Sequence, residues 1–474
     1  MRRATQATRS ASLASRIAGS SANTRTELSA VVRLAAPVIV VQVGMVLMGA
    51  VDTMMLGRVS ETDLAAGSIG NALSIAVIWS FIGILLAIDP MAAQAFGAGD
   101  HRQISRVLCR GVGMAVLLSV PATLIVLGLD RVLPLTGQPQ AIVDPAAAYL
   151  RGIGPGVIAF LLFMCLRQTL QAMSIVRPAL IAIGVANVFN AIANWALIFG
   201  HLGFPALGVR GSAYATSGSR WVMLIVVAAF GWRYLRRYVG GWQWSWLRPA
   251  ALRPFLFVGV PIAVQVSLEV TVFSFAAVLI GRLGEAQLSG HQVAISLASI
   301  SFMVPLGFAG AATTRVGNAI GRRDPVGARR SALVCLSLGA GVMVAFGLVF
   351  FSLPQLLARV FSDVPAVVSA AAALIPIAGL FQVADGLQVA AAGVLRGAAD
   401  TRFPAAVALV GYWVIGMPAG AWLTFERGFG PSGVWWGLTF GLVFVAIFLA
   451  FRVRWRLWRS GTAGLLPAEV VEDD

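Results

Sequence analysis

The feature that most constrains this chain is a series of apolar runs, each about 20 residues or longer. A helix of that length spans the hydrocarbon core of a bilayer, because each residue adds about 1.5 Å to its length. Only 11% of the chain is charged, against about 25% in a soluble protein. We therefore predict an all-α polytopic membrane protein with twelve spans, over residues 34–57, 66–90, 107–129, 146–171, 179–200, 208–232, 254–281, 290–314, 331–353, 370–395, 403–424 and 432–452.

The basic residues of the chain are all arginine, and they gather on one side of the predicted spans. They cluster in residues 233–253, 322–330 and 452–459, whereas few lie on the other side. Because cytoplasmic loops carry an excess of basic residues, both termini are expected in the cytoplasm. We therefore attribute the net charge of +16 to the arginines that orient the protein in the cell inner (plasma) membrane. No nucleic-acid partner is expected.

The two halves of the chain are related by an internal repeat. A shift of 224 residues aligns Pro37 with Pro261 and Asp100 with Asp324 without a gap. Six helices per half make the repeats parallel, which is a transporter architecture. We expect two pseudo-symmetric six-helix lobes, over 31–232 and 254–458, joined by a cytoplasmic linker loop over 233–253. Residues 1–30 are expected to form a disordered cytoplasmic tail, and residues 459–474 a second cytoplasmic tail.

Acidic side chains lie inside several predicted spans. Glu269 is roughly 20 Å from either end of its helix, Asp385 is also deep, and Asp52 lies nearer the outer face. Asp89 lies toward the inner end of its span. A charge at membrane depth is costly, so such residues are candidates for a functional site. Each could instead lock helices together through hydrogen bonds, and for Asp89 the two interpretations are balanced.

Three neutral polar residues follow the same reasoning. Asn190 and Asn194 stand four residues apart and share one helix face, from which they could accompany Asp52. Thr216 is a weaker candidate, because Ser and Thr commonly bond to backbone carbonyls in membrane helices. The alternative for the asparagines is helix packing alone.

Five segments of this sequence resemble the multidrug and toxic compound extrusion (MATE) family, in its NorM-like branch. They are VDTMMLGRVSETDLAA (51–66), LEVTVF (268–273), GHQVAISLAS (290–299), TRVGNAIGRRD (314–324) and AAAGVLRGAADTRFP (390–404). The resemblance implies an antiporter without enzymatic activity, which exports small organic cations in exchange for H⁺ or Na⁺. No cofactor beyond that coupling ion is expected, and the protein is expected to be a monomer in the bilayer.

The resemblance also assigns roles to particular residues. Glu269 and Asp385 match the family's acidic pair in the C-terminal lobe, and Gln292 matches a nearby polar position. The family's N-terminal polar cluster is matched by Asp52, Asn190, Asn194 and Thr216. Na⁺ could thus be held at Asp52, Asn190 and Asn194, or at Glu269 and Asp385.

Three positions depart from the NorM pattern. Phe381 stands where the family has a tyrosine, and Ser296 where it has an asparagine. Asp89 is the third departure. Because two Na⁺ ligands of the C-terminal lobe are lost or shortened, protons are the favoured coupling ion, with Na⁺ at most auxiliary.

Other functions fit this sequence less well than export. A lipid-linked oligosaccharide flippase of the same superfamily should have a cationic cavity, whereas the deep charges identified here are acidic. A passive channel lacks a selectivity-filter loop. No GxxxxGK[ST] loop and no HExxH motif occur, so nothing indicates ATP hydrolysis or a zinc protease.

Overall fold

The computed structural model describes the backbone of residues 2–136 and 139–458, and side chains from residue 24 onward apart from 135–138 and the C-terminal segment. The first half of the chain consists of α1 (Arg2–Leu56), α2 (Glu61–Leu85), α3 (Ile88–Ala98), α4 (His101–Gly128), η1 (Leu129–Arg131), η2 (Leu133–Thr136), α5 (Gln140–Ile153), α6 (Gly156–Ala172), α7 (Arg177–Phe199) and α8 (Val209–Val239). The short helix η3 (Trp244–Leu247) follows in the linker.

The second half repeats this pattern. It consists of α9 (Pro249–Gly281), α10 (Glu285–Gly321), α11 (Pro325–Ser352), α12 (Pro354–Arg359), α13 (Pro365–Gly397), α14 (Arg402–Ala408), the π-helix η4 (Leu409–Gly416), α15 (Met417–Phe425) and α16 (Pro431–Trp458). Within the described residues, eleven helical stretches are long and apolar enough to cross a membrane, and the pair α5–α6, bent by 48°, makes a twelfth. The predicted helical fold with twelve spans is confirmed, although the span predicted over 146–171 is this bent pair.

The repeat is visible in the local structure of one turn. Asp100 caps α4 by accepting a hydrogen bond from the backbone N–H of Gln103 at 2.8 Å, and Asp324 caps α11 through Gly327 at the same distance. Such caps satisfy N–H groups that a helix start leaves unpaired. Each cap follows a left-handed residue, Gly99 or Arg323, so the repeat preserves the shape of this turn.

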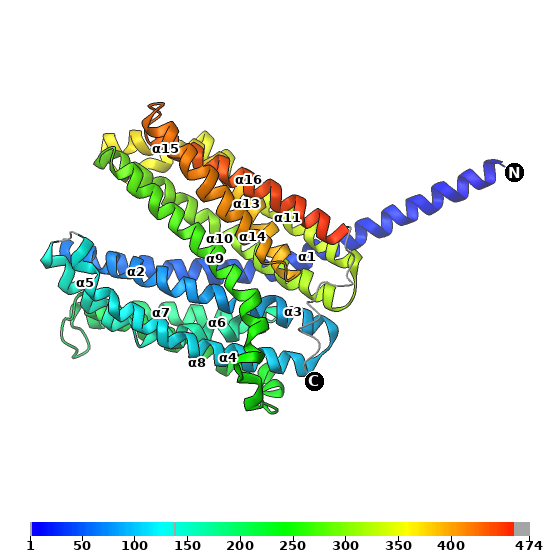
Figure 1. Cartoon of the computed structure of the whole chain (residues 1–474), viewed down its shortest axis with the longest axis horizontal. Helices are drawn as coiled ribbons and strands as arrows, with labels where there is room; N and C mark the ends of the chain where they lie inside the picture. The colour runs from blue at the N-terminus through cyan, green and yellow to red at the C-terminus, as the bar shows by residue number, and fades with distance from the viewer. Residues whose placement is uncertain (1, 137–138, 459–474) are drawn as a thin grey trace.

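Figure 1 shows two groups of helices that meet at one end and diverge toward the other. Helices α2–α8 form the N-terminal lobe, and α10–α16 form the C-terminal lobe. The lobes contact each other through the pairs α2–α9, α1–α10 and α3–α10. We call the end where α3, α8 and α10 finish the arginine-rich end, because the basic segments at 233–253 and 322–330 lie there.

Helices α1 and α9 each pass from one lobe to the other. The core of the C-terminal lobe includes Val31 and Leu34 of α1, and the core of the N-terminal lobe includes Phe255 and Ile262 of α9. The boundaries predicted for the lobes place each helix in a single lobe, and the structure differs in this respect. Proline lies near each crossing, at Pro37 in α1 and Pro261 in α9, where it removes one backbone hydrogen bond.

The segment predicted as a disordered N-terminal tail is helical, because α1 begins at Arg2. Its last part is also fixed to the C-terminal lobe. Arg315 donates two hydrogen bonds to Glu27, at 3.0 and 2.6 Å, and the Ser331 hydroxyl donates a third at 2.7 Å. Alanine and arginine favour helix, and no proline interrupts this segment. The predicted tail over 459–474 lies outside the described residues.

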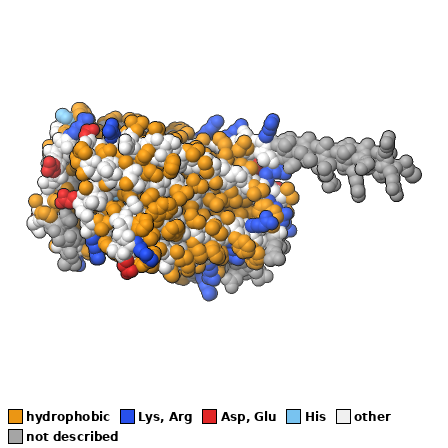
Figure 2. Space-filling view, turned by 90° about the horizontal axis from the view of Figure 1, so that it is seen from above, with side chains coloured by type: hydrophobic (Ala, Val, Ile, Leu, Met, Phe, Trp, Pro, Cys, Tyr) orange, Lys and Arg blue, Asp and Glu red, His pale blue; other side chains and the backbone are white. Residues whose placement is uncertain are grey.

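The surface agrees with a protein surrounded by lipid. Figure 2 shows hydrophobic side chains covering the middle of the molecule, with arginines toward its two ends. Exposed apolar side chains such as Leu117, Val188 and Ile225 lie along the helices rather than at their ends. In water a large apolar surface of this kind would be unfavourable, whereas helices with internally bonded backbones tolerate it in a bilayer.

Candidate functional site

The structure brings the four polar residues of the N-terminal lobe together around Asp52. Asn190 and Asn194 donate side-chain N–H groups to Oδ1 of Asp52 at 3.0 and 2.5 Å. The Thr216 hydroxyl donates to Oδ2 at 2.7 Å. All four residues are buried, and they come from α1, α7 and α8. This cluster places one carboxylate inside a shell of neutral donors.

Arg220 accompanies this cluster and was missed by the sequence analysis. It lies on α8 four residues after Thr216, is buried, and interacts electrostatically with Asp52. Its guanidinium carbon is 5.1 Å from the centre of the Phe160 ring, close enough for a cation–π contact. The signal was present in the sequence, because an arginine inside the apolar span predicted over 208–232 has to find a partner.

The acidic pair of the C-terminal lobe is arranged differently. Glu269 on α9 accepts hydrogen bonds at Oε1 from Gln265 at 3.0 Å and from Gln388 at 2.9 Å. Asp385 on α13 is 7% exposed and interacts electrostatically with Glu269. In the part of the chain that the structure describes, no hydrogen bond to Asp385 is found. The pair therefore has carboxylate oxygens that remain available for a cation.

Gln265 and Gln388 were also missed by the sequence analysis. A glutamine four residues before Glu269 shares its helix face, so Gln265 was open to prediction from spacing alone. Gln388 lies on another helix, and its contact required the tertiary structure. Tyr412, in the π-helix η4, is buried and interacts electrostatically with both Glu269 and Asp385. π-helical segments within α-helices often occur at functional sites.

Three further candidate positions of the C-terminal lobe have contacts outside the acidic pair: Phe381, Ser296 and Gln292. Phe381 is buried in an aromatic group, with the ring centres of Phe273 and Trp435 each 5.9 Å away. The Ser296 hydroxyl donates to the backbone carbonyl of Gln292 at 2.7 Å, and the Gln292 side chain is exposed. Among the described residues, no hydrogen bond joins either residue to the acidic pair.

Asp89 lies apart from both clusters, close to the arginine-rich end. It is buried on α3, and its Oδ1 atom has no hydrogen-bond partner. Its charge interacts with those of Arg167 on α6 and Arg396 on α13. Asp89 thus interacts with a basic residue of each lobe.

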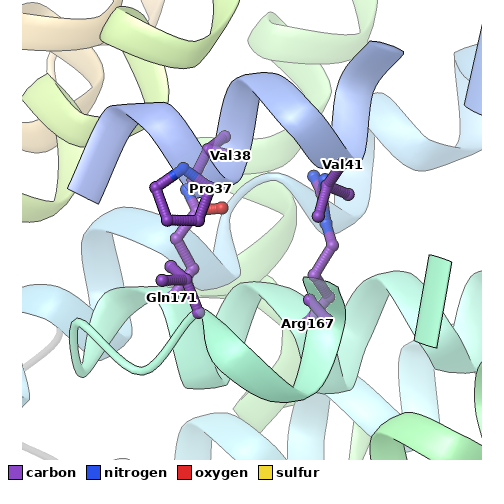
Figure 3. A pocket seen from close by; sticks show the side chains of 7 residues that line it. Pro37, Val38, Val41, Arg167 and Gln171 are labelled. Carbon is purple, nitrogen blue, oxygen red and sulfur yellow. The ribbon is translucent and has the colours of Figure 1, made fainter. Parts of the chain in front are cut away.

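The small cavity in Figure 3 lies between α1 and α6. Pro37 and Val41 line it from α1, and Arg167 and Gln171 from α6. Its volume of about 10 Å³ is enough for roughly one water molecule. Nη1 of Arg167 donates to Oε1 of Gln42 at 3.0 Å. This cavity is too small for an organic molecule, and its charged group is basic, so it is not a site for an organic cation.

Comparison with known proteins gives consistent matches. The MatE family model matches residues 37–196 and 261–422, one segment in each lobe. A probable multidrug resistance protein NorM of Mesorhizobium japonicum is 38% identical over 440 residues, covering 90% of this chain and 94% of the relative. The multidrug resistance protein PmpM of Pseudomonas aeruginosa is 35% identical over 440 residues, covering 90% and 91%.

Solved structures match the fold as well. The crystal structure of a eukaryotic MATE transporter has a TM-score of 0.87 at 23% identity, covering 93% of this chain and 98% of that one. An outward-facing multidrug resistance MATE transporter has a TM-score of 0.82 at 20% identity, covering 91% and 96%. At these identities the likeness shows the fold alone.

Proposed function

This chain belongs to the MatE family of membrane transporters, and from this premise we propose that it exports organic cations in exchange for an inward-moving cation. Family membership makes it a transport protein rather than an enzyme. Its relatives are named for multidrug resistance, which supports amphiphilic drugs and dyes as the substrate class and a role in antimicrobial resistance.

The observation that carries this proposal is the pair Glu269 and Asp385. These two carboxylates, on α9 and α13, lie in an apolar lobe: Glu269 accepts two hydrogen bonds at Oε1, and no hydrogen bond to Asp385 is found among the described residues. A cation offsets the cost of burying such charges. A substrate cation and a coupling ion would compete for the same pair, and that competition would link their movements in opposite directions.

Buried arginines bear on the flippase alternative. Arg167 and Arg220 are buried, and Arg396 is half-buried in the last turn of α13. Each of the three interacts with an acidic residue of this chain. Their charge is therefore balanced internally rather than free to bind a pyrophosphate. This balance favours export of cations over transport of a lipid-linked oligosaccharide.

For the coupling ion we propose protons, with Na⁺ at most auxiliary. Three donors already occupy the oxygens of Asp52 in the N-terminal cluster. A Na⁺ ion there would require the amides to turn their oxygens inward. In the C-terminal lobe, Phe381 has no oxygen to offer, and the Ser296 hydroxyl is engaged with its own helix. A proton needs only one carboxylate.

The proposal further includes insertion in the inner membrane with both termini in the cytoplasm, and function as a monomer. The arginine distribution supports this orientation. The protein would then take substrate from the arginine-rich end and release it at the opposite end.

The test is transport by purified protein in liposomes. A panel of cationic dyes is offered under an imposed pH gradient in Na⁺-free buffer, and separately under a Na⁺ gradient. We expect the pH gradient alone to drive dye movement. Dye movement under the Na⁺ gradient only would refute proton coupling, and an absence of movement under both would refute cation export.

A further inference from the structure

We propose that Arg396 links the acidic pair to the contact between the lobes, so that a cation bound at Glu269 strengthens closure of the arginine-rich end. This inference rests on the proposed function, in which Glu269 binds cations. It assigns Arg396 a positioning role, because the residue acts through Asp89 and not by contact with substrate.

The first step is the geometry of the contact between α3 and the C-terminal lobe. The side-chain amide of Gln94 on α3 donates to the backbone carbonyl of Gly397 on α13 at 2.9 Å. At Gly317 on α10 an added Cβ atom would come within 2.8 Å of the Cβ atom of Ala93. Helices of the two lobes thus pack closely here, and the contact includes the residue that follows Arg396.

The second step is an unsatisfied charge at this contact. Asp89 lies five residues before Gln94 on α3, is 4% exposed, and has one carboxylate oxygen without a hydrogen-bond partner. A buried carboxylate in this state is unfavourable unless a positive charge lies near. Arg167 supplies one charge from within the same lobe, and Arg396 supplies another from across the contact.

The third step is that Arg396 is shared. Its charge interacts with that of Asp89 and with that of Glu269. Gln388, on the same helix as Arg396, holds Glu269 by a hydrogen bond at 2.9 Å. A single guanidinium therefore interacts with Glu269 of the acidic pair and with Asp89 at the contact between the lobes.

The direction of the effect follows from Coulomb's law. While Glu269 is negative, it draws Arg396 away from Asp89. A cation bound at Glu269 cancels that attraction, and Asp89 then holds Arg396 more firmly. The contact between the lobes becomes more stable, and the equilibrium shifts toward the form closed at this end. A substrate cation that entered from the arginine-rich end would thus favour closure behind it.

The test measures distances across this end by pulsed electron resonance. Spin labels are attached at Arg102→Cys on α4 and Arg323→Cys after α10, both at exposed positions. The natural cysteines Cys109, Cys165 and Cys335, all buried, are replaced by alanine. Glu269→Gln removes the negative charge of this side chain, so its effect is measured with no ligand bound. We expect it to raise the ratio of short to long distances by about tenfold, within the range typical of coupling between sites.

The decisive comparison repeats Glu269→Gln in an Arg396→Gln background. We expect the shift to disappear there and to persist in an Arg402→Gln background. Arg402 is a suitable control, since it lies nearby, is exposed, and stacks on Phe257 at 3.6 Å. The same shift with and without Arg396, or no shift in either background, would overturn the inference.

A second arm uses tetraphenylphosphonium as the cation, with binding measured separately by calorimetry. We expect it to favour short distances in the parent protein and to bind Arg396→Gln without changing the distances. A change of distances in Arg396→Gln equal to that in the parent would overturn the inference. If the parent protein does not bind tetraphenylphosphonium, the proposed function is contradicted, while the ligand-free comparison still decides the role of Arg396.

Discussion

The hydrogen bond from Thr216 to Asp52 allows a sharp test of the N-terminal cluster. Thr216→Val keeps the shape of the side chain and removes its hydroxyl, which leaves Oδ2 of Asp52 without the donor at 2.7 Å. Hydrogen bonds to charged groups contribute about 1.5–3 kcal/mol. Those between membrane helices average about 0.6 kcal/mol and reach about 1.7. Because Asp52 is only 8% exposed, we expect a loss near the upper membrane value, about 1–2 kcal/mol.

The assay is thermal unfolding in detergent together with dye transport in liposomes. About 1.4 kcal/mol corresponds to a tenfold change in an equilibrium constant, so transport should fall by up to roughly that factor if the bond is present in only one state of the transport cycle. The matched control is Ser219→Ala on the same helix, since the Ser219 hydroxyl donates to the carbonyl of Ala215 and not to Asp52.

Thr216→Ser provides the complementary variant, because it retains the hydroxyl. We expect Thr216→Ser to transport nearly as well as the parent protein and Thr216→Val to be impaired. Parent-like stability and transport in Thr216→Val would refute the reasoning. So would equal impairment of Thr216→Ser and Thr216→Val, because the hydroxyl would then not be the cause.

Four further outcomes are expected. Glu269→Gln and Asp385→Asn should each abolish coupled export at normal expression, and parent-like transport in both would return these residues to a packing role. Phe381→Tyr should introduce a dependence of dye transport on Na⁺, and no change with Na⁺ would show that the added hydroxyl is not a ligand. Glu27→Gln should lower the unfolding temperature by a few degrees, because it removes the negative charge that accepts hydrogen bonds from the C-terminal lobe. An unchanged melting curve would contradict this expectation. A reporter enzyme inserted at Gly241 should show cytoplasmic activity, and periplasmic activity there would overturn the orientation.

Much of the fold was open to prediction from the sequence because the bilayer imposes a simple rule. Any span must be about 20 apolar residues long and helical, so hydropathy alone located the helices. The bend between α5 and α6 was not predicted, although Gly154 and Pro155 stand at it. The passage of α1 and α9 from one lobe to the other could not be predicted, because hydropathy identifies a span but not the helices that it packs against.

The candidate site was partly predictable for a related reason. An acidic residue in an apolar helix stands out, and Asp52, Glu269 and Asp385 were found in that way. Arg220 was open to the same argument, but most arginines of this chain lie outside the predicted spans, where they indicate orientation and not a site. The contact of Gln388 with Glu269 joins residues 119 positions apart, and no local pattern specifies such a pair.

The passage of α1 and α9 between the lobes has a consequence for how the protein is made. When the ribosome has completed α8, the first six spans still lack Phe255 and Ile262, which belong to their core. The first lobe therefore cannot finish packing until the beginning of the second repeat has entered the membrane. A break in the linker would likewise not yield two independent halves, because each fragment would carry a helix segment that completes the other. Co-expressed fragments should consequently assemble by mutual insertion, whereas either fragment alone should be recognised by quality-control proteases as incomplete.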